Sequence, residues 1–182
     1  MTAEESLNLL KEGNRRYLTA SAMSGDISST RRQQTAEQGQ HPHAIVIACS
    51  DARVIPEAIF SSSLGDLFTV RIAGNVLDEH QLGSVEYAAM HLGCPLVVVL
   101  GHTRCGAISA ALGTHLEGFI RSITNEIRKA AGAERDPAKI CRLNVRRGVQ
   151  LLREAFRAHH ASGALKVVGA IYDTDSGEVH WM

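Results

Sequence analysis

Two short polar stretches hold the side chains best suited to metal binding and proton transfer. Residues 49–53 read Cys-Ser-Asp-Ala-Arg, and residues 102–106 read His-Thr-Arg-Cys-Gly. Two thiolates and one imidazole form a donor set that suits a borderline-soft metal, and zinc fits this set best. We therefore predict that Cys49, His102 and Cys105 together bind a zinc ion.

Three protein ligands leave a fourth coordination position open, which is typical of catalytic zinc sites. Water in that position becomes a nucleophile because the metal lowers its pKa towards about 7. Asp51 lies two residues after Cys49. It is expected either to accept a hydrogen bond from the metal-bound hydroxide or to bind the metal as a fourth ligand. Arg53 presents a planar fork for a carboxylate, so we predict an Asp51–Arg53 pair in which Asp51 stays ionised.

Each stretch follows a predicted strand. Continuous apolar runs indicate buried strands of a parallel sheet, and they cover 44–49, 67–72, 96–101 and 164–173. Helices are predicted at 4–18, from Pro56, at 78–92, 105–112, 116–131 and 137–160, and a turn at Asp175–Gly177 precedes a last short strand. The alternation predicts an α/β fold in which a mainly parallel sheet is flanked by helices. Sites in such sheets form at the carboxyl ends of strands, so the two stretches are expected to converge.

The composition narrows the class of protein. The chain has 182 residues, 45% of them hydrophobic, and its 19 basic residues balance its 19 acidic ones. These values predict one globular domain rather than a mainly disordered chain, and they argue against a nucleic-acid partner. The sequence contains no run of about 18 apolar residues and no signal-peptide pattern. We therefore expect no membrane partner and a cytoplasmic location.

The two remaining cysteines are not expected to bind the metal. In a reducing compartment Cys94 and Cys141 are expected to be buried thiols.

Residues 1–40 are predicted to form an N-terminal helix and a polar arm that contacts another subunit. Residues 41–182 are predicted to form the zinc-binding α/β domain.

The two polar stretches, with their surroundings, resemble the β-class carbonic anhydrases. CSDAR and HTRCG look like the zinc site of that family. Three further segments look like its opening helix, its central segment and its closing helix and strand: LKEGNRRYL (10–18), RIAGNVLDEHQLGSVEYAAMHLG (71–93) and NVRRGVQLLREAF…GALKVVGAIYDTDSGEV (144–179). The match spans nearly the whole chain and is weakest in the polar arm and in residues 113–143.

The resemblance implies reversible hydration of carbon dioxide to bicarbonate and a proton by attack of zinc-bound hydroxide. It places one zinc ion per subunit on the three predicted ligands and a catalytic dyad on Asp51 and Arg53. The family's substrate pocket falls on Gln40, Phe68 and Tyr87, and the backbone amide of Gly106, at a helix start, is expected to help bind the anion.

The resemblance also implies a homodimer or homotetramer with its site near the subunit boundary. Two alternatives stay open: a carbonyl sulfide or carbon disulfide hydrolase on the same scaffold, and a non-catalytic protein that senses zinc or bicarbonate.

Overall fold

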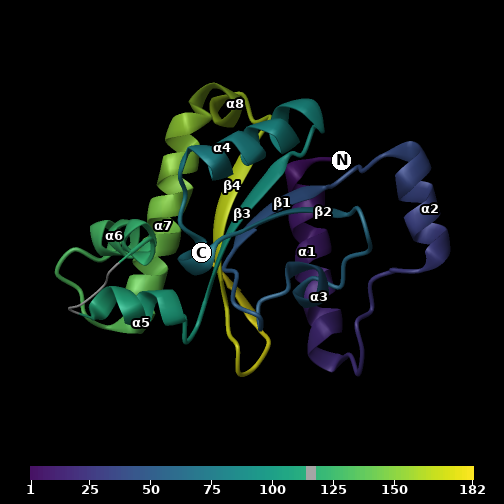
Figure 1. Cartoon of the computed structure of the whole chain (residues 1–182). Coiled ribbons are helices and arrows are strands. Elements are labelled where there is room, and N and C mark those ends of the chain that lie inside the picture. Colours follow the sequence, from purple (N-terminus) through teal and green to yellow (C-terminus); the bar gives the residue numbers. More distant parts are fainter. Residues whose placement is uncertain (114–117) are drawn as a thin grey trace.

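A single five-stranded sheet organises the chain in the computed structural model, which describes residues 1–113 and 118–182 (Figure 1). The strands are β1 (Ala44–Ala48), β2 (Leu67–Arg71), β3 (Leu96–His102), β4 (Lys166–Tyr172) and β5 (Val179–Trp181), in the spatial order β2-β1-β3-β4-β5. The first four run parallel, and β5 pairs antiparallel with β4. The predicted mainly parallel α/β sheet is confirmed.

Helices cover both faces of the sheet. They are α1 (Ala3–Thr19), α2 (Ser29–Gln38), α3 (Pro56–Ile59), α4 (Glu79–Glu86), α5 (Gly106–Leu112), α6 (Ile120–Ala131), α7 (Pro137–Ala155) and α8 (Arg157–Ala161), with a 3₁₀ turn η1 (Ala73–Asn75) and a π-helical turn η2 (Tyr87–His91). Figure 1 shows α1, α2 and α3 to one side of the strands and α5, α6 and α7 to the other.

The core consists of two layers because side chains alternate between the faces of a strand. In β1, Ile45 and Ile47 pack in the layer that includes residues of α5, α6 and α7. Val46 faces the opposite layer, where it joins Leu7 and Leu10 of α1. All five residues of β1 are buried, which explains why the strand reads as an unbroken apolar run.

The N-terminal helix belongs to this core. Thr2 and Glu5 form a capping box at the start of α1, as expected for a Thr followed three residues later by Glu. Asn14 of α1 donates hydrogen bonds to the carbonyl oxygens of Ile59 (3.2 Å) and Gly177 (3.0 Å). By contrast, every residue of α2 is at least partly exposed, so the predicted polar arm contains a helix with a solvent-facing surface.

Three predicted helices have different bounds in the structure. The segment predicted at 78–92 changes from α-helix to a π-helical turn at Tyr87. The segment predicted at 137–160 is divided into α7 and α8 at Phe156, whose φ of −108° and ψ of 34° leave the helical range. The helix predicted at 116–131 begins at Ile120 as α6, and residues 116 and 117 lie outside the described residues. Within residues 1–113 and 118–182, no helix combines the length and apolar character that a membrane crossing requires.

The order in which strands are added to the sheet reverses between β1 and β3, which run parallel to each other. From β1 the chain moves outward to β2 and then returns to form β3 on the other side of β1. The carboxyl ends of β1 and β3 are therefore neighbours, and helices leave them in opposite directions. A ligand site is expected at such a reversal, and the two polar stretches meet there.

Candidate metal centre

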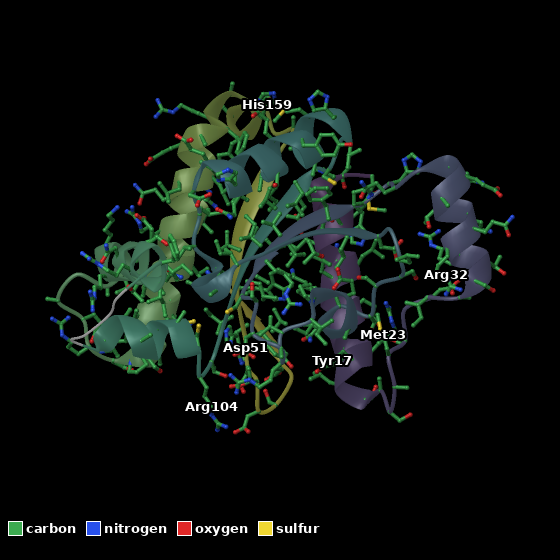
Figure 2. The ribbon with its side chains drawn as sticks, viewed as in Figure 1. Tyr17, Met23, Arg32, Asp51, Arg104 and His159 are labelled. Atoms are coloured by element: carbon green, nitrogen blue, oxygen red, sulfur yellow. The ribbon has the colours of Figure 1, made fainter. Side chains whose placement is uncertain are left out.

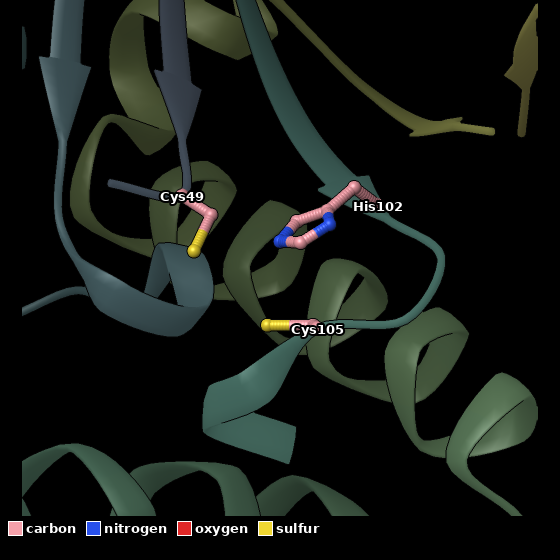
Figure 3. A group of neighbouring side chains, drawn as sticks. All are labelled: Cys49, His102 and Cys105. Atoms are coloured by element: carbon pink, nitrogen blue, oxygen red, sulfur yellow. The ribbon is translucent and has the colours of Figure 1, made fainter. Parts of the chain in front are cut away.

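Cys49, His102 and Cys105 converge at the carboxyl ends of β1 and β3. Cys49 follows the last residue of β1, His102 ends β3, and Cys105 precedes the first turn of α5. Their ligand atoms all lie within 4.8 Å of one another, and Figure 3 shows the three side chains pointing towards a common centre. All three residues are buried.

The imidazole of His102 is oriented for metal binding. Its Nδ1 lies 2.9 Å from the carbonyl oxygen of Thr103, and a carbonyl can only accept, so Nδ1 carries the proton. Nε2 is then left with a lone pair. Nε2 is buried and has no hydrogen-bond partner within the described residues. A buried acceptor of this kind is what a metal ligand requires, so the residues present fit a metal ion.

A hydrogen bond between the two ligand thiols shifts their pKa values in opposite directions. The hydrogen bond from the Cys105 thiol lowers the pKa of Cys49 to about 4, although burial acts in the opposite direction. The same hydrogen bond, together with burial, raises the pKa of Cys105. Backbone N–H groups of Gly74 and Asp51 also point at the Cys49 sulfur, at 3.2 and 3.4 Å.

Asp51 lies beside this centre, and Arg53 holds its carboxylate through hydrogen bonds. Arg53 donates from Nε to Oδ1 (2.9 Å) and from Nη2 to Oδ2 (2.8 Å), and its backbone N–H donates to Oδ1 (3.0 Å). These hydrogen bonds hold the pKa of the Asp51 carboxyl well below its usual range, with burial opposing them. Oδ2 of Asp51 lies 4.0 Å from Nε2 of His102. The Asp51–Arg53 pair expected from the sequence is present in the structure.

Two supports of the ligand loop were missed in the sequence. Arg71, at the end of β2, donates to the carbonyl oxygens of Cys49 (3.2 Å) and Asp51 (2.7 Å). The Arg104 carbonyl accepts a hydrogen bond from Arg53 (3.1 Å) while Arg104 itself adopts a positive φ of 56°. Figure 2 shows Asp51 and Arg104 at the same end of the sheet. Only the position of Arg71 at a strand end hinted at its role.

The predicted substrate-pocket residues lie away from this centre within one chain. The rings of Phe68 and Tyr87 are 6.1 Å apart. Phe68 pairs with Ile45, which is four residues before Cys49, or roughly 13 Å along the strand. Gln40 is exposed in the loop before β1. Tyr87 is 47% exposed, whereas Phe68 is half-buried and packs against the core.

A cleft of about 530 Å³ reaches His102 and Cys105 from the side of α5 and α7, and Arg104, Asp136 and Arg142 also line it. The backbone N–H groups of Ala107 and Ile108, in the first turn of α5, act to lower the pKa of the Cys105 thiol, although Cys49 and burial raise it by more.

Cys94 and Cys141 are buried free thiols, as predicted. The Cys94 thiol donates to the carbonyl oxygen of Pro42 (2.9 Å), and the Cys141 thiol donates to that of His102 (3.3 Å). Burial raises the pKa of Cys94 to about 12 and that of Cys141 to about 11. Protonated thiols are poor metal ligands, so both residues are structural.

Comparison with known proteins agrees with this geometry. The family model described as "Carbonic anhydrase" matches residues 44–179. The chain is 37% identical over 181 residues to "Carbonic anhydrase 2" of Mycobacterium tuberculosis, an alignment that covers 92% of this chain and 87% of that protein. This chain belongs to the β-carbonic anhydrase family. The resemblance seen in the sequence is thereby confirmed.

Other β-carbonic anhydrases extend the similarity to structure. A carbonic anhydrase of Mycolicibacterium smegmatis is 36% identical over 183 residues, which cover 93% of this chain and 88% of that one. The solved structure of the Coccomyxa β-carbonic anhydrase in complex with acetazolamide has a TM-score of 0.74 and 29% identity, over 97% of this chain and 86% of that one. Zinc is the metal of the β-carbonic anhydrases, and the Cys–His–Cys cluster provides its ligands here.

Proposed function

We propose that this chain catalyses the reversible hydration of carbon dioxide to bicarbonate and a proton. The observation that carries the proposal is the convergence of Cys49, His102 and Cys105 within 4.8 Å, beside a carboxylate that Arg53 holds on both oxygens. Zinc held by these side chains supplies a Lewis acid that makes water nucleophilic near neutral pH.

Asp51 orients the attacking water in this proposal. The carboxylate is ionised, so it only accepts hydrogen bonds. It accepts one from an O–H group of the water and so directs the lone pair of the water oxygen towards the carbon of carbon dioxide. Arg53 fixes the direction of both carboxylate oxygens and prevents Asp51 from turning away. The proton released on hydration then passes to solvent buffer.

We further propose that the active assembly is a homodimer or homotetramer in which Gln40, Phe68 and Tyr87 complete the site of a neighbouring subunit. The exposed ring of Tyr87, beside Phe68 of the edge strand β2, supports this, since Phe and Tyr are enriched where proteins associate. Residues 1–40 include an exposed helix that suits contact with the same neighbour. The N–H of Gly106 remains a proposed contact for bicarbonate.

A cytoplasmic location is also proposed. The four cysteines of the chain are free thiols, as suits a reducing compartment.

Stopped-flow hydration of carbon dioxide by the zinc-loaded protein, from neutral to alkaline pH, tests the proposed activity. Rapid hydration at all these pH values is expected, because Arg53 holds Asp51. Activity confined to alkaline pH would instead indicate that Asp51 binds zinc at neutral pH. If the zinc-loaded protein hydrates carbon dioxide at none of these pH values, the proposal is wrong. Turnover of carbonyl sulfide or carbon disulfide would then identify a sulfur-substrate hydrolase.

A further inference from the structure

We propose that Asn144 is a positioning residue of the metal centre, which acts through Gly74 to hold a backbone hydrogen bond on the Cys49 sulfur. The inference rests on the proposed metal site. Asn144 lies in the middle of α7, 95 residues after Cys49 in the sequence and outside both polar stretches.

Asn144 makes a defined contact with the 3₁₀ turn η1. Its side chain is buried, with 5% of the residue exposed. Its Nδ2 donates to the carbonyl oxygen of Gly74 at 2.8 Å. Because a carbonyl oxygen only accepts, the amide nitrogen rather than the amide oxygen must face it. The orientation of the Asn144 side chain is therefore determined by this contact.

Gly74 connects this contact to the metal ligand. Its N–H donates to the Cys49 sulfur at 3.2 Å, while its φ of +69° lies in the left-handed region. A Cβ at this position would lie 2.8 Å from Cδ1 of Ile127 and 3.1 Å from Cβ of Ala107. Glycine is therefore required here both by its backbone conformation and by the lack of space.

The same glycine is the most flexible point of the turn, so contacts from other elements help to hold it. Glycine has the widest range of accessible backbone conformations, so its two flanking peptides are free to rotate unless something holds them. The following residue, Asn75, also has a positive φ of 43°, which adds strain to the turn. Two hydrogen bonds hold the peptide after Gly74: the N–H of Asn75 donates to the carbonyl oxygen of Ile72 within the turn (2.9 Å), and Asn144 donates to the carbonyl oxygen of Gly74 from α7. The contact from Asn144 ties the turn to α7 and so keeps the N–H of Gly74 directed at the Cys49 sulfur.

A hydrogen bond to a ligand sulfur alters the metal that the sulfur binds. The N–H group withdraws electron density from the thiolate, so the thiolate donates less charge and the metal remains more electrophilic. The N–H group also stabilises the ionised form of the thiol and fixes the direction of the sulfur, and removing a group that orients a ligand typically costs about 10–100-fold in metal affinity or activity. Asn144 thus supports the metal from a helix that contributes none of the three ligands.

The test compares Asn144→Ala with a matched variant, Asn14→Ala. Asn14 is also a buried asparagine, with 6% exposure, and its Nδ2 also donates to backbone carbonyls, those of Ile59 and Gly177. It ties α1 to the other layer of the core. Asn14→Ala removes three hydrogen bonds between distant segments and Asn144→Ala removes one. Both are therefore expected to lower stability, Asn14→Ala by at least as much, but only Asn144 leads to a metal ligand.

Two measurements on metal binding separate the variants. Zinc affinity, from competition with a chelator, is expected to fall about 10–100-fold in Asn144→Ala and to stay at the wild-type value in Asn14→Ala. In the cobalt-substituted proteins, the sulfur-to-metal charge-transfer band is expected to move to longer wavelength in Asn144→Ala only, because the filled sulfur orbitals lose the stabilising N–H group. Asn144→Leu, which keeps most of the side-chain volume, provides a second variant if Asn144→Ala does not fold.

Wild-type zinc affinity and band position in a folded Asn144 variant would overturn the inference. Equal changes in Asn14→Ala would also overturn it, because the effect would then come from general loss of stability. Hydration of carbon dioxide by the wild-type protein is a separate readout. Its absence would contradict the proposed function, while the comparison of metal binding would still decide the role of Asn144.

Discussion

Arg53 holds both carboxylate oxygens of Asp51, with Nε 2.9 Å from Oδ1 and Nη2 2.8 Å from Oδ2. A bidentate pair of this kind fixes the plane of the carboxylate as well as its position. Oδ2 is the oxygen that lies 4.0 Å from Nε2 of His102. The acceptor proposed to orient water is therefore set at the edge of the metal centre by a residue only two positions away in the sequence.

Replacement of Asp51 is expected to separate metal binding from turnover. Asp51→Asn removes the ionised acceptor but none of the three metal ligands, so zinc content should stay at one per chain. The hydration rate should fall by about 100-fold or more, as when a positioned proton acceptor is lost. Metal analysis with stopped-flow hydration measures both quantities. Asp175→Asn is the matched control, because Asp175 forms an exposed pair with Arg104 (2.9 Å) and surface pairs contribute little. Near-wild-type turnover in Asp51→Asn would rule out the proposed role of Asp51.

The two classes of cysteine are expected to respond differently to substitution. Cys49→Ser should lose both zinc and activity, because a neutral hydroxyl replaces a thiolate ligand. Cys94→Ser should keep both, since Cys94 only donates a hydrogen bond to the Pro42 carbonyl and serine keeps that donor. Zinc stoichiometry after gel filtration, together with the hydration rate, distinguishes the two. Full zinc occupancy in Cys49→Ser would exclude Cys49 from the metal site.

Mixed oligomers test whether Tyr87 serves a neighbouring subunit. Cys49→Ser is expected to lack the metal, and Tyr87→Ala lacks an aromatic group proposed for the substrate pocket. When the two variants are refolded together, a mixed dimer contains one intact site, and random pairing should restore up to about a quarter of the wild-type activity. A mixture of Cys49→Ser with Asp51→Asn is the control, because both defects lie in the same half of the site. An absence of recovery in the first mixture would place Tyr87 in the site of its own chain or in no site.

The pH dependence of stability is expected to contain a contribution from His43. Burial lowers the pKa of this histidine, and the nearby Asp66 opposes the shift only partly. Nδ1 of His43 lies 3.0 Å from the Ser6 hydroxyl. As pH falls below the ordinary histidine pKa of about 6.5, the unfolded chain takes up a proton that the folded chain resists. The contribution of His43 to stability is therefore present above that pH and is lost as pH falls towards the lower folded pKa.

His43→Gln should reduce this loss of stability. The measurement is the free energy of unfolding in urea between pH 8 and pH 5, with saturating zinc in all samples. His80→Gln is the control, because the His80 side chain is 94% exposed and its removal should leave the slope unchanged. A wild-type slope in His43→Gln would show that His43 does not titrate differently on folding.

The three metal ligands, the Asp51–Arg53 pair and the parallel sheet could be predicted from the sequence alone. These features could be predicted because each depends on short segments of the sequence. Apolar runs such as 44–49 and 96–101 indicate buried strands, and the residue types that follow them limit the chemistry. The rule that sites form at the carboxyl ends of such strands then brings together two stretches separated by about 50 residues. The structure confirms this convergence with ligand atoms within 4.8 Å of one another.

Contacts between distant segments were decided only by the tertiary structure. The sequence does not indicate that Asn144 reaches Gly74 or that Arg71 holds the carbonyl oxygens of the ligand loop. Nor does it indicate that Phe68 pairs with Ile45, roughly 13 Å along the strand from the metal centre of its own chain. A buried amide, a strand-end arginine and a half-buried phenylalanine look alike in any α/β chain, since hydrogen-bond partners depend on how helices and strands pack. Motif and periodicity thus determined which residues bind the metal, and packing determined which residues hold those ligands in place.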